Sequence, residues 1–367
     1  MITVPTVGTL QPRFDKVERI AFLRGRGLGD LIGTLPAAES LAAAYPGADI
    51  TLLGTPLHAA LLKGRPSPFA DVVVLPSYPG VHDGVEDPAA TADWFAAMED
   101  RRFDLAVQVH GGGRNSNPFL LRLCARHTVG TRTEDAVPLE RNLPYVLHQH
   151  EALRALEVVA LAGAAPVRLE PQVQLTPAEA AEPAATQRTR VALHPGATDP
   201  RRRWPVDNFA AVAAALARQD REVAVVGDRS EADLAAEVVG RALEHGAPKD
   251  RVCSRAGQLT LSELVSLLAG SALLVANDSG PRHLAAAVGT PTASIYWFGN
   301  MLSYGPLSRG RHRVQLGWTT HCPVCGVDCT EAGWTAERCE HDDSIVAGVP
   351  VEGVLADAGA LLGNAET

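Results

Sequence analysis

The sequence predicts an α/β protein with two doubly wound domains that face each other across a cleft. Short apolar runs alternate with helical stretches in the first half of the chain, and the same alternation restarts after residue 189. At 367 residues the chain is also too long for one ordinary core. Ligands of such sheets bind beyond the carboxyl ends of the strands, so we expect the chemistry in the loops that follow them.

The first domain is predicted from four apolar runs that are typical of buried parallel strands. Helical stretches separate these runs, and the first helix stops at the turn signal Tyr45-Pro46-Gly47. The expected strands cover 17–23, 50–53, 72–75 and 105–109, and the expected helices cover 31–44, 89–99 and 148–161.

A change in composition separates the two domains, because residues 164–189 are rich in Ala, Pro, Glu, Gln and Thr. We predict a first domain over 1–165, a linker over 166–188 and a second domain over 189–367. A last helix over 351–362 could pack back toward the first domain. In the second domain the expected strands are 191–193, 222–226, 272–276 and 292–296, and the expected helices are 206–218, 231–243 and 261–269.

Composition and charge exclude several classes of protein. Hydrophobic residues make up 46% and charged residues 20% of the chain, which is normal for a globular protein and excludes general disorder. The net charge of −9 argues against a protein that coats nucleic acid. No apolar run is long enough for a transmembrane helix, and residues 1–11 lack the pattern of a secretory signal, so we expect a cytoplasmic protein.

The stretch Asn277-Asp278-Ser279-Gly280-Pro281-Arg282-His283-Leu284 carries the strongest chemical signal. It joins an expected strand to an expected helix, so backbone N–H groups are free at a helix N-terminus, where the dipole favours an anion. Gly280 lets a phosphate approach closely. His283 falls one turn into the helix, a place where histidine is more often structural than catalytic. The pattern indicates a diphosphate site.

A second loop of the same domain could complete that site. His194-Pro195-Gly196 follows the first strand of the domain, and Arg201-Arg202-Arg203 lies just before the next helix. The arginines could clamp a diphosphate from the side opposite Ser279. The alternative is a solvated basic run in an arginine-rich protein, although Trp204-Pro205 stiffens the loop.

In the first domain, Arg24-Gly25-Arg26-Gly27-Leu28-Gly29-Asp30 joins the first strand to the first helix. Its glycines do not form a dinucleotide fingerprint. Asp30 could cap the helix, which spacing alone favours, or accept a proton from a substrate hydroxyl. After the fourth strand, His110-Gly111-Gly112-Gly113 could shape an acceptor pocket, and a hydrogen-bonded loop histidine is the equal alternative.

Six cysteines are present, and two of them, Cys124 and Cys253, are expected to be isolated buried thiols. The other four lie within the segment 321–341, flanked by two histidines. Their spacing could hold a structural zinc ion, but it matches no well-defined zinc ribbon, and thiols that staple an irregular loop are the rival interpretation. We therefore assign no metal to the predicted site. The four are Cys322, Cys325, Cys329 and Cys339.

Together these segments resemble glycosyltransferase family 9, the bacterial heptosyltransferases that add heptose from ADP-heptose to the inner core of lipopolysaccharide. The resemblance spans about residues 17 to 300. Three motifs carry it: Gly27-Leu28-Gly29-Asp30 leading to Thr34-Leu35-Pro36; His194-Pro195-Gly196 followed by Arg202-Arg203-Trp204-Pro205; and the stretch 277–287 continuing to Gly289-Thr290-Pro291-Thr292.

The resemblance implies a GT-B fold, with the acceptor on the first Rossmann-like domain and the nucleotide-sugar donor on the second. It implies an inverting transfer without a catalytic metal, in which Asp30 matches the family's proposed general base. A glycan or glycoconjugate is the implied acceptor, and a lipid-linked one would bring peripheral membrane contact. The residues implied for the donor are His194, Gly196, Arg202, Arg203, Asp278, Ser279, Gly280 and His283, and those we expect for the acceptor are Gly29, His110 and Gly111.

Some positions depart from the family pattern. Arg202 stands where the family usually has lysine, which keeps the charge but changes its reach. The segment 76–93 has no counterpart that we can map, so the acceptor is the least defined partner. Two alternatives remain: a GT-B transferase or epimerase that uses a different nucleotide sugar, and a non-catalytic relative that binds a nucleotide or carbohydrate.

Overall fold

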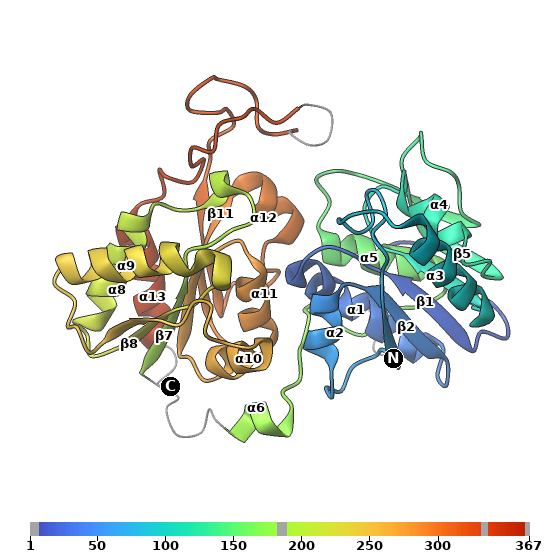
Figure 1. Ribbon diagram of the computed structural model, residues 1–367, viewed down its shortest axis with the longest axis horizontal. Helices are drawn as coiled ribbons and strands as arrows, with labels where there is room; N and C mark the ends of the chain where they lie inside the picture. Colours follow the sequence, from blue (N-terminus) through green and yellow to red (C-terminus); the bar gives the residue numbers. More distant parts are fainter. Residues whose placement is uncertain (1–6, 182–188, 332–336, 364–367) are drawn as a thin grey trace. The chain divides into compact units, whose positions relative to one another are not determined.

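The computed structural model describes residues 7–181, 189–331 and 337–363, and the chain divides into two compact units, Met1–Gln174 and Leu175–Thr367. Each unit contains one parallel sheet of six strands with helices packed on it, as Figure 1 shows. The predicted α/β class is therefore confirmed. Among the described residues, no helix combines the length and the apolar character needed to cross a bilayer.

The first unit has the strand order β3-β2-β1-β4-β5-β6. The sheet grows in one direction from β1 to β3 and in the other from β4 to β6, so β1 and β4 flank a topological switch point. Leu23 is in register with Gln108, which aligns the carboxyl ends of these two strands. The strands are β1 (Arg19–Leu23), β2 (Asp49–Gly54), β3 (Asp71–Val74), β4 (Leu105–Gln108), β5 (His127–Arg132) and β6 (Arg141–Pro144).

Helices of the first unit bury apolar faces on the sheet, and an aromatic cluster closes one side of its core. Tyr78 packs edge-on against Phe119, with ring centroids 4.9 Å apart, and Trp94 donates to the Val74 carbonyl at 2.8 Å. These contacts anchor the segment 76–93 on the sheet. The helices are α1 (Leu28–Ala44), α2 (Pro56–Leu62), α3 (Pro88–Asp100), α4 (Ser116–Leu121) and α5 (Glu151–Leu161).

The second unit repeats the same permutation, in the order β12-β11-β10-β7-β8-β9, so its switch point lies between β7 and β10. Ala276 is in register with His194, which brings the two motif-bearing loops to the same edge of the sheet. The strands are β7 (Arg190–His194), β8 (Glu222–Val225), β9 (Val252–Ser254), β10 (Leu273–Asn277), β11 (Thr292–Trp297) and β12 (His312–Gly317).

The helices of the second unit cover its sheet from residue 206 onward, and a short helix precedes them. That helix, α6, lies inside the stretch we predicted as a linker, and its Glu179 carboxylate accepts from the Ser262 hydroxyl at 2.7 Å. The helices are α6 (Pro177–Ala181), α8 (Val206–Ala217), α9 (Ala232–Glu244), α10 (Leu261–Ala269), α11 (Gly280–Ala287), α12 (Phe298–Tyr304) and α13 (Val351–Gly363).

Two features differ from the sequence expectations. The last helix, α13, packs its apolar face into the core of the second unit, where Val354, Ala358 and Leu361 are buried in one cluster with Trp204. Its apolar stripe finds a complementary surface beside β11 and α8, which is nearer along the chain than any face of the first unit. Cys124 and Cys253 are exposed rather than buried. Cys253 lies in β9, the edge strand of its sheet, and Cys124 follows the end of α4.

Candidate functional site

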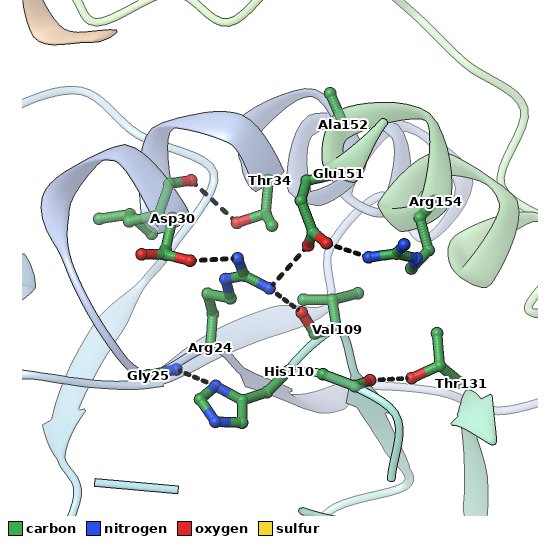
Figure 2. A network of polar contacts seen from close by, with 12 residues as sticks. Arg24, Gly25, Asp30, Thr34, Val109, His110, Thr131, Glu151, Ala152 and Arg154 are labelled. Atoms are coloured by element: carbon green, nitrogen blue, oxygen red, sulfur yellow. Dashed lines mark hydrogen bonds and ion pairs between the residues drawn. The ribbon is translucent and has the colours of Figure 1, made fainter. Parts of the chain in front are cut away.

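A buried arginine organises the loop that follows β1. Arg24 is only 2% exposed, and its guanidinium binds the Asp30 carboxylate at 2.6 Å and the Glu151 carboxylate at 3.3 Å (Figure 2). It also donates to the Val109 carbonyl. One cation therefore ties the loop after β1 to the end of β4 and to the start of α5.

Asp30 uses both of its carboxylate oxygens within this loop. Oδ1 accepts from Arg24, while Oδ2 accepts from the Gly27 backbone N–H at 3.1 Å, at the start of α1. The Asp30 side chain is 19% exposed. Asp30 thus caps its helix, as the spacing suggested, and part of its side chain stays accessible to solvent or a substrate.

Glu151 and Arg154 extend the network away from Asp30. Both lie in the first turn of α5, where they form an ion pair, and Arg154 also stacks over the Tyr145 ring at 4.2 Å. Figure 2 shows the resulting chain of alternating charges, which runs from Asp30 through Arg24 and Glu151 to Arg154. The positive charge of buried Arg24 is shared between two carboxylates, those of Asp30 and Glu151. Asp30 therefore does not face an unpaired positive charge.

His110 connects the loops that follow β1 and β4. Its Nδ1 accepts from the Gly25 backbone N–H at 3.1 Å, and its Nε2 donates to the Gly80 carbonyl at 3.0 Å. Burial, together with the charges of Arg24 and Arg26, lowers the pKa of His110 to about 4, so the ring is neutral. A Cβ on Gly25 would lie 2.4 Å from the Val81 carbonyl, so only glycine fits this crossing.

The other residues expected near an acceptor lie at the same edge of the sheet. Gly29 is in the first turn of α1, beside Asp30. Gly111 follows β4 with a φ of +64°, a left-handed conformation that glycine adopts without strain. The side chain of Gln108 donates to the His110 carbonyl at 2.9 Å and so supports the glycine turn from inside the sheet.

In the second unit, Asp278 is the centre of the loop after β10. It is 4% exposed, and its two oxygens bind Arg202 at 2.9 Å, Asn300 at 2.8 Å and His283 at 3.1 Å. Burial alone would raise the pKa of Asp278, but the hydrogen bond from His283 and the nearby guanidinium charges lower it. Asp278 is therefore an ionised group that positions the surrounding donors.

His194 links the loop after β7 to the loop after β10. Its Nδ1 lies 2.9 Å from the Ser279 hydroxyl, and its Nε2 lies 3.1 Å from Glu231. Ser279 stands at the N-cap position of α11, but its side chain makes no capping bond and turns to His194 instead. A Cβ on Gly196 would lie 1.7 Å from a Glu231 oxygen, so Gly196 makes room for this carboxylate.

The three arginines before α8 have separate partners. Arg201 is buried against Asp199 at 2.6 Å, Arg202 reaches Asp278, and Arg203 donates to the Ala197 carbonyl at 3.0 Å. The Asn277 side chain accepts from the Trp204 backbone N–H at 3.1 Å and thereby fixes the end of this loop to β10. Each arginine thus has a defined partner within an ordered loop, and the alternative of a solvated basic run is wrong.

Several residues at these two edges were not among the predicted site residues. Arg24 and Asn277 lie inside the predicted motifs without an assigned role, and their position at the ends of apolar strands could have singled them out. Glu151 and Glu231 carried no such signal, because they reach the sites from helices more than 30 residues away in the chain. They are the carboxylates that hold Arg24 and His194 in place.

The cysteine-rich segment brings four ligand groups together. The ligand atoms of Cys322, Cys325, Cys339 and His341 all lie within 4.8 Å of one another. Cys329, which the spacing grouped with the other cysteines, is not in this set. All six cysteines are free thiols, so no disulfide staples the loop.

Comparison with known proteins gives a consistent answer. The family model for glycosyltransferase family 9 (heptosyltransferase) matches residues 97–334, well over half of the chain. Lipooligosaccharide heptosyltransferase 2 of Haemophilus influenzae is 30% identical over 171 residues, which cover 43% of this chain and 48% of that protein. The chain thus spans about half the length of the curated relatives it matches.

Solved structures agree in fold. Escherichia coli ADP-heptose lipopolysaccharide heptosyltransferase II superposes with a TM-score of 0.73 at 20% identity, covering 95% of this chain and 100% of that one. TibC, an iron-containing dodecameric heptosyltransferase of enterotoxigenic Escherichia coli, gives a TM-score of 0.57 at 14% identity, with 97% and 79% covered. The expected GT-B fold of two Rossmann-like domains is confirmed.

Proposed function

The chain belongs to glycosyltransferase family 9, and on this basis we propose that it transfers a sugar from a nucleotide-sugar donor to a hydroxyl of a glycan or glycoconjugate. ADP-heptose is the proposed donor and heptose the transferred sugar, since the matched relatives are named as heptosyltransferases. The single observation that carries the proposal is the family match, which covers the loop after β10 and the loop after β7.

The donor is assigned to the second unit. A diphosphate at the N-terminus of α11 would meet the backbone N–H of Gly280 and the favourable end of the helix dipole. Ser279 and Arg202 are held at the same edge by His194 and Asp278. These groups would stabilise the negative charge that builds on the departing nucleotide diphosphate as the glycosidic bond breaks.

His194 connects the two loops of this site. Its Nδ1 lies 2.9 Å from the Ser279 hydroxyl, and its Nε2 lies 3.1 Å from the Glu231 carboxylate. We therefore assign His194 the role of orienting Ser279 toward the diphosphate.

The acceptor and the base are assigned to the first unit. Asp30 is partly exposed, and its carboxylate would take the proton of an acceptor hydroxyl as that oxygen attacks the anomeric carbon. An attack from the face opposite the leaving group inverts the configuration. His110 contributes indirectly: it is neutral and buried, and it pins the loops that carry Gly29 and Gly111 beside the acceptor.

The acceptor chemistry follows the relatives. Because they are named as lipopolysaccharide or lipooligosaccharide enzymes, we propose an inner-core glycan as the acceptor class. An acceptor of that class is attached to lipid, which would bring the enzyme to a membrane surface without a spanning helix.

The deciding experiment is calorimetric titration of the purified protein with ADP, GDP, UDP and dTDP in the absence of added metal. We expect ADP to bind more tightly than the other three. Incubation with ADP-heptose and a heptose-deficient lipopolysaccharide should then release ADP and extend the glycan. Selective binding of another nucleotide would overturn the heptose assignment but keep the transferase, and failure of all four to bind would overturn both.

A further inference from the structure

Between β12 and α13, residues 318–331 and 337–350 form an irregular excursion, drawn in red-orange in Figure 1. Four potential ligands lie in it at the spacing Cys-x2-Cys, then thirteen residues, then Cys-x-His. Their ligand atoms lie within 4.8 Å of one another. In a tetrahedral zinc site the sulfur atoms are about 3.8 Å apart, so the site can close with shifts of about 1 Å.

The first pair of cysteines sits on a tight turn that presents both sulfurs to one side. The turn reads Cys322-Pro323-Val324-Cys325-Gly326, and Gly326 has a φ of +71°. The Gly326 N–H donates to the Cys322 carbonyl at 2.9 Å. A Cys-x2-Cys pair on such a turn is the arrangement that structural zinc sites use.

The histidine of the group has a buried nitrogen without a partner. His341 Nδ1 is shielded from solvent and makes no hydrogen bond to any residue that the structure describes. An orphaned ring nitrogen is costly in a protein interior, since it loses its bond to water and gains nothing in return. Beside three thiols, a metal ion is the partner that would satisfy it.

We propose that Cys322, Cys325, Cys339 and His341 bind one tetrahedral transition-metal ion. Thiolate and imidazole ligands select zinc or ferrous iron over magnesium or calcium, and four protein ligands leave no open position for substrate. The centre is therefore structural. Cys329 is outside the ligand set, because its Sγ contacts the Val327 carbonyl at 3.6 Å.

The residues that follow the ligands hold the arginine loop of the candidate donor site. The Ser344 hydroxyl donates to the Arg203 carbonyl at 2.7 Å, and the Ile345 N–H donates to the Arg201 carbonyl at 2.8 Å. A metal ion would fix residues 339–341 and, through these bonds, the backbone on either side of Arg202. This consequence rests on the proposed function, whereas the metal site itself does not.

The test is the metal content of the full-length protein, purified without chelators under reducing conditions and measured by elemental mass spectrometry. We expect about one zinc or iron ion per chain. Cys325→Ser and His341→Gln should each lose it, while Cys329→Ser and the distant Cys253→Ser should keep it. Circular dichroism and elution volume identify any variant that fails to fold. Chelation of the unaltered protein should release the metal, and added zinc should restore it.

Two results would overturn the proposal. One is metal-free protein that also takes up neither zinc nor iron when it is reconstituted. The other is a Cys329→Ser variant that loses the metal as completely as Cys325→Ser, which would replace His341 by a fourth thiolate. Because metal content does not depend on turnover, these results are separate from failure of the proposed transfer. If the metal is present but its removal leaves ADP affinity unchanged, the link to the arginine loop is wrong.

Discussion

Asp30 is a helix cap, and we also propose it as the general base. Its carboxylate caps α1 through the Gly27 N–H and forms an ion pair with Arg24, yet about a fifth of its side-chain surface remains accessible. The cap and the ion pair fix where the carboxylate points. A general base needs such a fixed direction, so the structural role is compatible with the proposed chemical one.

We expect Asp30→Asn to reduce transfer by about 10²–10⁴-fold, because the amide cannot accept the acceptor's proton. The affinity for ADP should not change, since Asp30 and the assigned donor residues lie in different units. Steady-state kinetics and calorimetry test the two parts. Asp135→Asn is the control, because that carboxylate is exposed in the same unit and pairs only with groups at the surface. Normal turnover in Asp30→Asn would remove the residue from the mechanism.

Arg24 is expected to matter for stability as well as for function. Replacing it by Met leaves the Asp30 and Glu151 carboxylates without the cation that they share, and loss of one partner from a buried ion pair costs about 3–5 kcal/mol. Arg101→Met, which breaks the exposed pair with Asp71, should cost less than about 1 kcal/mol. Denaturant unfolding of both variants measures the difference. Equal effects would mean that the Arg24 network contributes no more than a surface pair.

At the scale of elements, the two units solve the same problem in the same way. In each, two neighbouring parallel strands at a switch point end in loops that a histidine ties together: His110 for β1 and β4, His194 for β7 and β10. Parallel strands place these loops side by side, but nothing in the sheet itself sets the spacing of their tips. The imidazoles set it, and glycines at 25 and 196 provide the room.

The loop after β7 gives a direct test of this packing. Gly196→Ala would drive a methyl group into the Glu231 carboxylate and displace the partner of His194, so we expect ADP to bind at least about tenfold more weakly, as loss of one charge-assisted hydrogen bond implies. Gly240→Ala is the matched control. That position, inside α9, has open space around it, and alanine should stabilise the helix slightly. Unchanged ADP affinity in Gly196→Ala would contradict the role of His194.

The neutral His110 predicts how the first unit responds to acid. Its pKa falls from the ordinary value to about 4 in the folded protein, so between pH 6.5 and 4 only the unfolded chain takes up the proton. The contribution of the neutral His110 to the free energy of unfolding is fully present above pH 6.5 and is lost as the pH falls toward 4. We expect a loss of about 2 kcal/mol between pH 7 and 5 from this residue.

Unfolding free energies at the two pH values check this expectation. The pH dependence should become shallower in His110→Gln, and it should stay as it was in His245→Gln, whose ring is well exposed on the second unit. A His110→Gln variant with the same dependence as the unaltered protein would mean that His110 is protonated in the fold.

At the scale of the whole molecule, each unit has its own sheet, its own core and its own candidate site. We therefore expect a fragment over 175–367 to bind ADP with an affinity close to that of the full chain, and a fragment over 1–174 to bind none. Calorimetry on both fragments measures this, after circular dichroism has shown that they fold. ADP binding by the first fragment would reverse the assignment of donor and acceptor to the two units.

Much of the architecture could be predicted from the sequence, because buried parallel strands are short apolar runs and their helices have clear ends. The strand expected at 292–296 and the helix at 261–269 lie where the structure has β11 and α10. Polar or short elements were not predicted. One example is β5 (His127–Arg132), whose sequence mixes apolar, basic and hydroxyl residues. The last helix was assigned to the second domain, but the surface that covers it could not be predicted, since its periodicity shows an apolar face and not the partner of that face.

The chain pattern alone determined the α/β class and the doubly wound domains, and it singled out the loops that we propose carry the chemistry, because these depend on the order of residues within a strand, a turn or a helix end. Which groups meet in those loops was decided by packing. Arg24 finds Glu151 and His194 finds Glu231 across 127 and 37 positions of the chain. Such partners depend on where folded strands and helices bring distant backbone together, and no local pattern records that.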